Sequence, residues 1–130
     1  MNNPARGFDA MQAGTPLPPL RLAISAAASE RYWRAAGVDH PVLRAGALYP
    51  PIAANLTVLC FGQVCADAVI QTRQVVRCHR RCDADVELVT SGRITDRYEK
   101  RGRVYVDIAT EVTTADGEPL WSSEVSFTPV

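Results

Sequence analysis

The chain has 130 residues, of which 14 are basic and 14 acidic, so its formal net charge is zero. This length predicts a single domain, and a hydrophobic fraction of 47% suffices for one modest core. Because there is no basic excess, neither nucleic acid nor an anionic membrane surface is an expected partner. The longest apolar run is too short and too interrupted to cross a bilayer. No signal-peptide pattern opens the chain, and these features together predict a cytoplasmic protein.

Residues 1–18 are rich in glycine, proline and asparagine and show no apolar periodicity. We therefore expect them to form a flexible N-terminal arm. The remainder, residues 19–130, is predicted to be a single domain that begins with a short strand over 20–26. A small helix follows, with Ser29 as its N-cap and Gly37 as its end.

A long buried helix is predicted from Pro51 to Cys65. This segment has few polar residues and no polar stripe, which is typical of a helix that other elements enclose. Pro51 suits the first turn of a helix, because the N–H that proline lacks would have no partner there. The residues between the two helices are expected to form a loop, which prolines and Gly46 hold open.

The second half of the chain predicts antiparallel strands. One β-rich run ends at Cys78, another starts at Asp85, and residues 103–114 alternate apolar and polar side chains as a half-buried strand does. Turn signals at Lys100–Gly102 and Asp116–Gly117 separate the last strands. The order of elements predicts an α+β fold, in which one long central helix is wrapped by a curved antiparallel sheet of about five strands.

Two of the four cysteines lie in the segment Cys78–Cys82, which reads CHRRC. In an extended chain their Cα atoms would lie about 13 Å apart, whereas a disulfide needs about 7 Å or less. The spacings differ from the C-x2-C pairs of zinc ribbons, and Cys60 and Cys65 fall on opposite faces of the predicted helix. We therefore expect reduced, structural thiols and no metal site. Phosphate-binding and dinucleotide motifs are also missing from the sequence, so no cofactor is expected.

The segment 75–130 resembles the C-terminal half of MaoC-like hydratases and dehydratases, which have the hot-dog fold. It shares with them the order of long strands, a Lys-Arg-Gly turn and an Asp-Gly turn. It departs from them where Arg81-Cys82 and Ala84-Asp85 stand in place of the usual proline and Gly-Asp. Residues 29–59 resemble the small helix, active-site loop and central helix of the family, so that the resemblance extends over about residues 20–130.

Catalytic members of that family carry the loop motif D-x-N-P-x-H. Its aspartate and histidine activate the water that adds to, or leaves from, an enoyl or 3-hydroxyacyl thioester. Aligned on Pro41, the resemblance puts Val38 and Leu43 at those two positions, so the acid–base pair is missing in this register. Asp39 and His40 lie beside it and are the candidate catalytic residues of a shifted pair. Alternatively, they form a surface pair in the loop, or a helix cap and a satisfied side chain.

The resemblance also implies that the first N–H groups of the central helix face the thioester carbonyl and stabilise its enolate. Tyr49, Ala53, Ala54 and Asn55 are therefore the candidate substrate-binding residues. The small alanine side chains let a ligand approach the backbone, and Tyr49 either lines the acyl tunnel or is a packed aromatic. Family members often carry His-Gly at the positions of Ala54 and Asn55, so this oxyanion site is altered as well.

Several functions are open at this point. The chain could be an acyl-binding subunit that shapes the tunnel for a catalytic partner. It could instead be an enzyme, either an active enoyl-CoA hydratase with a shifted Asp39 and His40 pair or a hot-dog acyl-CoA thioesterase. The last alternative is a scaffold that only completes a dimer. The expected ligand is an acyl thioester of CoA or of acyl carrier protein. The expected partner is a second hot-dog chain, in a homodimer or heterodimer, because one curved sheet leaves an edge strand unpaired.

Overall fold

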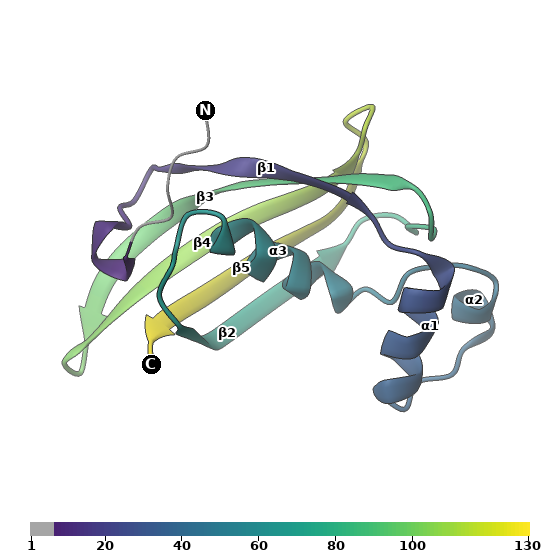
Figure 1. Ribbon diagram of the computed structural model, residues 1–130, viewed down its shortest axis with the longest axis horizontal. Helices are drawn as coiled ribbons and strands as arrows, with labels where there is room; N and C mark the ends of the chain where they lie inside the picture. Colours follow the sequence, from purple (N-terminus) through teal and green to yellow (C-terminus); the bar gives the residue numbers. More distant parts are fainter. Residues whose placement is uncertain (1–6) are drawn as a thin grey trace.

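The computed structural model describes residues 7–130 (Figure 1). Its helices are the 3-10 turn η1 (Phe8–Ala10), α1 (Ala26–Ala35), α2 (Pro41–Arg44) and α3 (Ile52–Gly62). Its strands are β1 (Pro16–Ala23), β2 (Val69–Cys78), β3 (Glu87–Lys100), β4 (Arg103–Thr114) and β5 (Pro119–Pro129). None of the helices within residues 7–130 is long and apolar enough to cross a membrane.

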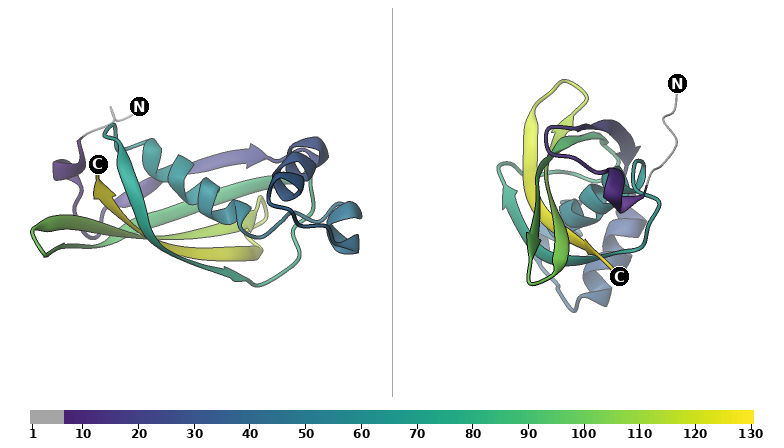
Figure 2. Two further views of the ribbon diagram at one scale, coloured as in Figure 1. Left: turned by 90° about the horizontal axis from the view of Figure 1, so that it is seen from below. Right: turned by 90° about the vertical axis from the view of Figure 1, so that its left-hand side faces the viewer.

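The five strands form one antiparallel sheet in the order β1-β3-β4-β5-β2. The sheet curls around α3, which lies along its concave side, while α1 and α2 lie beyond one end of it (Figures 1 and 2). The predicted α+β class, with one central helix wrapped by a curved antiparallel sheet, is confirmed. This is the hot-dog fold that the resemblance implies. The strands β1 and β2 are the two edges of the sheet.

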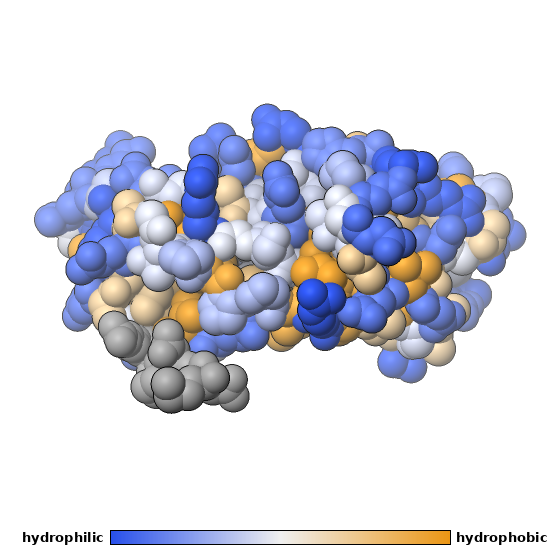
Figure 3. All heavy atoms as spheres, turned by 90° about the horizontal axis from the view of Figure 1, so that it is seen from above, coloured by the Kyte–Doolittle hydropathy of each residue, from blue (hydrophilic) through white to orange (hydrophobic). Residues whose placement is uncertain are grey.

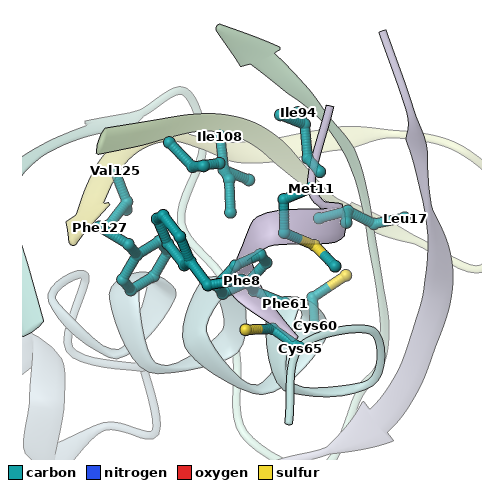
Figure 4. Packing of buried hydrophobic residues seen from close by; sticks show 11 residues of the cluster. Phe8, Met11, Leu17, Cys60, Phe61, Cys65, Ile94, Ile108, Val125 and Phe127 are labelled. Carbon is teal, nitrogen blue, oxygen red and sulfur yellow. The ribbon is translucent and has the colours of Figure 1, made fainter. Parts of the chain in front are cut away.

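The core consists of two apolar clusters, one under each half of α3. Under its C-terminal half, the rings of Phe61 and Phe127 stack with their centroids 4.8 Å apart (Figure 4). The helix ends at Gly62 rather than at the predicted Cys65. Cys65 therefore follows the helix, and it joins Cys60 in the same cluster instead of facing the opposite way. The second cluster, under the N-terminal half, contains Leu48, Ala53, Leu56, Cys82, Leu88, Val112, Leu120 and Trp121.

The predicted flexible arm over residues 1–18 is corrected for the part of it that the structure describes. Phe8 and Met11 are buried in the core beneath α3 (Figure 4). The backbone N–H of Phe8 donates to the Asp67 carboxylate at 2.8 Å, and Arg97 Nη1 donates to the carbonyls of Phe8 and Met11 at 2.9 Å each. The composition of this segment predicted an arm, but burial of the Phe8 and Met11 side chains holds the segment against the domain. The first six residues lie outside the described part.

The first helix begins earlier than predicted. Ser25 is its N-cap, and the Oγ of Ser25 accepts a hydrogen bond from the N–H of Ala28 at 3.1 Å. Ser29, the predicted cap, lies within the helix and is buried, because the alanines before it also favour a helix. The predicted end at Gly37 is confirmed, and its φ of 72° is one that glycine adopts without strain.

Hydroxyl side chains cross the middle of the core, between the two clusters. The Oγ1 of Thr57 on α3 donates to the carbonyl of Ala53 at 3.1 Å, and a hydrogen bond of 2.7 Å joins it to the hydroxyl of Thr110. Ser123 pairs with Thr110 across β4 and β5. Its Oγ, like Nε1 of the nearby Trp121, is buried without a hydrogen-bond partner among the described residues. Of these buried hydroxyls, those of Thr57 and Thr110 therefore have hydrogen-bond partners, whereas that of Ser123 has none among the described residues.

The CHRRC segment forms the end of β2 and the start of the connection to β3. Cys78 is exposed, whereas Cys82 is buried in the second cluster. Burial, aided by the charge of Asp83, raises the pKa of Cys82 to about 11. Burial also raises the pKa of Cys60 and that of Cys65. In the described part of the chain, no three side chains of histidine, cysteine, aspartate or glutamate come together as metal ligands.

We predict that two hydroxyl deletions have different effects on the free energy of unfolding. Thr57→Val removes the two hydrogen bonds of a buried hydroxyl, and it should lower the free energy of unfolding by about 1–3 kcal/mol. Ser123→Ala removes a buried hydroxyl that has no partner, so it should change the free energy by less than about 0.5 kcal/mol or raise it. Urea unfolding of both variants measures the difference. Equal losses would show that the hydroxyl of Ser123 is bonded after all.

We also predict that a single thiol reacts fast with an alkylating reagent in the native protein. Cys78 is exposed, whereas Cys82 is shielded and stays protonated at pH 8 because its pKa is raised to about 11. Mass spectrometry of iodoacetamide-treated protein should find Cys78 labelled first. Cys78→Ser should remove the fast phase, and Cys82→Ser should leave it unchanged. A fast phase that survives Cys78→Ser would contradict the burial of the other thiols.

Candidate functional site

The candidate catalytic residues Asp39 and His40 lie on the exposed approach to α2. The Oδ1 of Asp39 pairs with Nε of Arg44 at 2.9 Å. His40 is the N-cap of α2, and its Nδ1 accepts a hydrogen bond from the N–H of Val42 at 3.1 Å. Each side chain is thus engaged by α2 rather than by the other. This arrangement agrees with the account of the pair as a surface residue and a helix cap, and the shifted catalytic pair stays a prediction.

The two positions at which the resemblance puts the family's acid–base pair are Val38 and Leu43. The N–H of Val38 donates to the carbonyl of Trp33 at 2.9 Å, which attaches the loop to the end of α1. Leu43 is buried and lines a hollow of about 230 Å³ between α1 and α2, together with Ser29 and Trp33. The position of the family's histidine therefore faces α1.

A groove of about 360 Å³ lies where α3 begins. It is lined by Pro50 and Pro51 on one side and by Gln74, Val76 and Cys78 of β2 on the other. The three β2 residues alternate along the strand, so their side chains point to the same face of the sheet. The groove therefore runs between the start of the central helix and one edge of the sheet.

The register with β5 shows that this is the inner face of the sheet. Val76 pairs with Ser123, and Cys78 pairs with Trp121, both of which are buried beneath α3. Residues that pair directly across antiparallel strands share a face. Two of the buried polar atoms that lack a partner among the described residues, Ser123 Oγ and Trp121 Nε1, thus belong to the strand next to the groove wall.

The four candidate substrate-binding residues surround the start of α3 without lining the groove. Ala53 and Ala54 are buried, and Asn55 is exposed. Tyr49 is half-buried and packs against Tyr32 of α1, with ring centroids 5.9 Å apart at an angle of 54°. This contact agrees with the account of Tyr49 as a packed aromatic. The groove begins at the next residues along the chain.

The first N–H groups of α3 donate hydrogen bonds to the turn that precedes the helix, so they are not free for the ligand contact that the resemblance implies. Those of Ile52, Ala53 and Ala54 donate to the carbonyls of Tyr49, Pro50 and Pro51 at 3.0, 3.0 and 3.2 Å. Pro51 has helical φ and ψ of −57° and −16°, so the turn before the helix places these carbonyls three residues back, as in a 3-10 helix. The positive end of the helix dipole still lies beside the groove.

The groove contains binding groups without an acid–base pair. Its polar side chains are the Gln74 amide and the Cys78 thiol, and its lining among the described residues includes neither a carboxylate nor a histidine. The amide can donate to or accept from a ligand. A neutral amide is a poor general base, so this arrangement offers hydrogen bonds to a ligand but no group suited to proton transfer.

The β2 face of this groove was not among the sequence-based candidates, which came from the loop and from the central helix. The available signal was the alternation of Gln74, Val76 and Cys78 along one strand. That alternation identifies a shared face, but not which helix end the face meets. The hollow lined by Leu43 and the groove lined by Val76 share no residue, so the candidate catalytic loop and the helix start are not parts of one described cavity.

The sequence matches no protein-family model and no curated protein. Its structure is similar to the (R)-hydratase from A. caviae involved in PHA biosynthesis, with a TM-score of 0.76 and 13% identity over 93% of this chain and 98% of that one. The HadBC complex from Mycobacterium tuberculosis, a 3R-hydroxyacyl-ACP dehydratase, gives a TM-score of 0.73 and 16% identity over 91% and 98% of the two chains.

A MaoC-like dehydratase from Rhodospirillum rubrum gives a TM-score of 0.73 and 13% identity, over 96% of this chain and 97% of that one. These likenesses cover nearly the whole chain at low identity, so they bear on the fold. The predicted resemblance is confirmed at that level: the chain has the hot-dog fold of MaoC-like dehydratases and (R)-hydratases.

Proposed function

We propose that the chain is the acyl-thioester-binding subunit of a hydratase or dehydratase, and that a second hot-dog chain supplies the acid–base residues. The observation that carries this proposal is the groove at the start of α3. It lies beside an open sheet edge, and no carboxylate or histidine is among its described lining residues. The similar structures support the class of reaction, and one of them is a complex of a dehydratase.

The groove suits an acyl thioester in size and chemistry. Its volume of about 360 Å³ lies within the range of small-molecule sites, roughly 300–1,000 Å³. Pro50, Pro51 and Val76 present apolar surface to an acyl chain or a pantetheine arm, and the Gln74 amide offers a hydrogen bond. The positive end of α3 favours the polarised thioester oxygen. Whether the carrier is CoA or acyl carrier protein depends on groups outside this groove.

A partner chain would cover apolar side chains that are exposed on the central helix. Val58 and Leu59 of α3 are 38% and 54% exposed. Figure 3 shows, for one face of the molecule, apolar areas on a surface that is otherwise largely polar. An unpaired edge strand together with an uncovered apolar helix face is suited to a second chain of the same fold.

The alternative enzyme accounts have less support in the geometry. An active shifted pair would require Asp39 to leave Arg44 and His40 to leave the N-terminus of α2. Thioester hydrolysis requires a carboxylate or histidine near the helix start, and the groove is lined by neither type of residue in the described chain. The cytoplasmic location and the lack of a cofactor stay predictions.

We predict that the chain forms at least a dimer at micromolar concentration and that Leu59→Lys weakens it. The charge would have to be buried against the apolar surface of the partner, which costs several kcal/mol unless it is paired. Val42→Lys is the matched control, because Val42 is 39% exposed but belongs to α2. Sedimentation velocity of the three proteins measures the change. A dimer that tolerates Leu59→Lys would place the interface elsewhere.

We predict binding without efficient turnover when the chain is alone. Calorimetry should detect crotonyl-CoA binding, whereas hydration should be about 10²- to 10⁴-fold slower than with an intact acid–base pair. Val76→Trp should fill the groove and abolish binding, and Val86→Trp, at an exposed site away from it, should not.

Two further variants separate this proposal from the shifted-pair account. Asp39→Ala and His40→Ala should leave crotonyl-CoA binding unchanged. Robust hydration by the unmodified chain that either substitution abolishes would establish the shifted pair and refute the non-catalytic role.

A further inference from the structure

The hollow between α1 and α2 is a second cavity with features of a binding site. It encloses about 230 Å³ and is bounded by α1, α2 and the segment that leads to β3. It shares no lining residue with the groove at the start of α3. What it binds is therefore a separate question from the proposed acyl-thioester function.

One wall of the hollow carries a buried hydroxyl that has nothing to bond to. Ser29 is only 4% exposed, and its Oγ has no hydrogen-bond partner among the described residues. Buried polar side chains are nearly always bonded, because an unsatisfied one costs about 1–3 kcal/mol. Ser29 is one of the residues that line the hollow, but its Oγ has almost no accessible surface, so a ligand oxygen would satisfy the hydroxyl once the side chain turns towards the hollow.

Two guanidinium groups at the same hollow retain unused donors. Nε and Nη2 of Arg34 both lie 2.8 Å from Oε1 of Glu30, and Nε of Arg44 lies 2.9 Å from Oδ1 of Asp39. Each guanidinium has five N–H donors, so several stay free in each arginine. Both ion pairs are exposed, and such pairs contribute only about 0–1 kcal/mol. An anion can therefore recruit these arginines at little cost.

The remainder of the hollow is apolar. Trp33 and Leu43 are buried, and Ala84 closes the side towards β3. The guanidinium of Arg34 lies 5.0 Å from the centroid of the Trp33 ring, which holds it beside this apolar surface. A donor-rich rim over a small apolar floor suits a ligand with one anionic group and a short hydrocarbon body.

We propose that this hollow binds a short-chain carboxylate. The carboxylate accepts hydrogen bonds from the hydroxyl of Ser29 and from the guanidinium of Arg44 or Arg34, and its hydrocarbon chain contacts Trp33 and Leu43. Glu30 and Asp39 balance the charges of Arg34 and Arg44 in the free protein, so the carboxylate is attracted by the free N–H donors of the two guanidinium groups and not by a net charge. The small volume and the apolar floor favour a carboxylate over a phosphate ester.

Titration of the isotope-labelled protein with sodium butyrate, followed by two-dimensional NMR, tests the proposal. The signals of the Ser29 amide and the Trp33 indole should shift and saturate. Butyramide, which has the same shape without the charge, should cause no saturating shift, and phosphate at equal ionic strength should bind more weakly. Linear shifts, equal effects of butyrate and butyramide, or tighter binding of phosphate would each overturn the proposal.

Three variants test the assigned contacts. Ser29→Ala and Arg44→Gln should each weaken butyrate binding about tenfold, as expected for loss of a hydrogen bond to a charged group. Asp39→Asn is the matched control, because it breaks the ion pair of Arg44 but leaves the guanidinium in place, and it should bind at least as well. Ser29→Ala removes no bond in the free protein, so its unfolding midpoint should not fall. Unchanged affinity in Ser29→Ala, or loss of affinity in Asp39→Asn, would refute the assignment.

Discussion

The burial of α3 by the curved sheet is the constraint on which the rest of the structure depends. The helix carries apolar or small side chains around most of its circumference, with Asn55 and Thr57 as its only polar residues between Ile52 and Phe61. Such a helix is stable only when other elements remove it from water. The sheet provides this by curling, and the rings of Phe61 on the helix and Phe127 on the sheet stack within that contact. Since the curl also leaves the helix start near the β2 edge, it creates the groove.

The enclosure is incomplete on one side, and this has functional consequences. Val58 and Leu59 remain exposed because a single sheet does not close around the helix. The same opening leaves β2 without a neighbour on its outer side. A second chain of similar shape would solve both problems at once. Binding and association are therefore linked in the proposed function, since the groove lies at the edge that a partner would cover.

The loop that resembles the family's active-site loop is held in place by its own polar side chains. His40 caps α2 and Asp39 pairs with Arg44, so both polar side chains stabilise the short helix that follows them. The position of Leu43 is apolar and packs towards α1. The loop and the two short helices form one α1–α2 unit, in which the hydroxyl of Ser29 and two arginines border a small cavity.

Much of the fold follows from local patterns in the sequence. The alternation over residues 103–114 predicts the inner face of β4, and Val106, Ile108 and Val112 are indeed buried. The apolar helix and the turn at Asp116–Gly117 are local features of the same kind. A period of 2 or 3.6 residues depends only on backbone geometry, so it can be read without knowing the fold.

The tertiary structure alone decided which distant residues meet. Phe8 and Met11 enter the core only because the curved sheet leaves room under the C-terminal half of α3. The groove joins Pro50 and Pro51 to Val76 through the curl of the sheet, and no local pattern specifies that contact. Likewise, the sequence determined that Asp39 and His40 are adjacent, but the formation of α2 decided their partners. Contacts between distant segments depend on register and curvature, which are properties of the whole sheet rather than of any one strand.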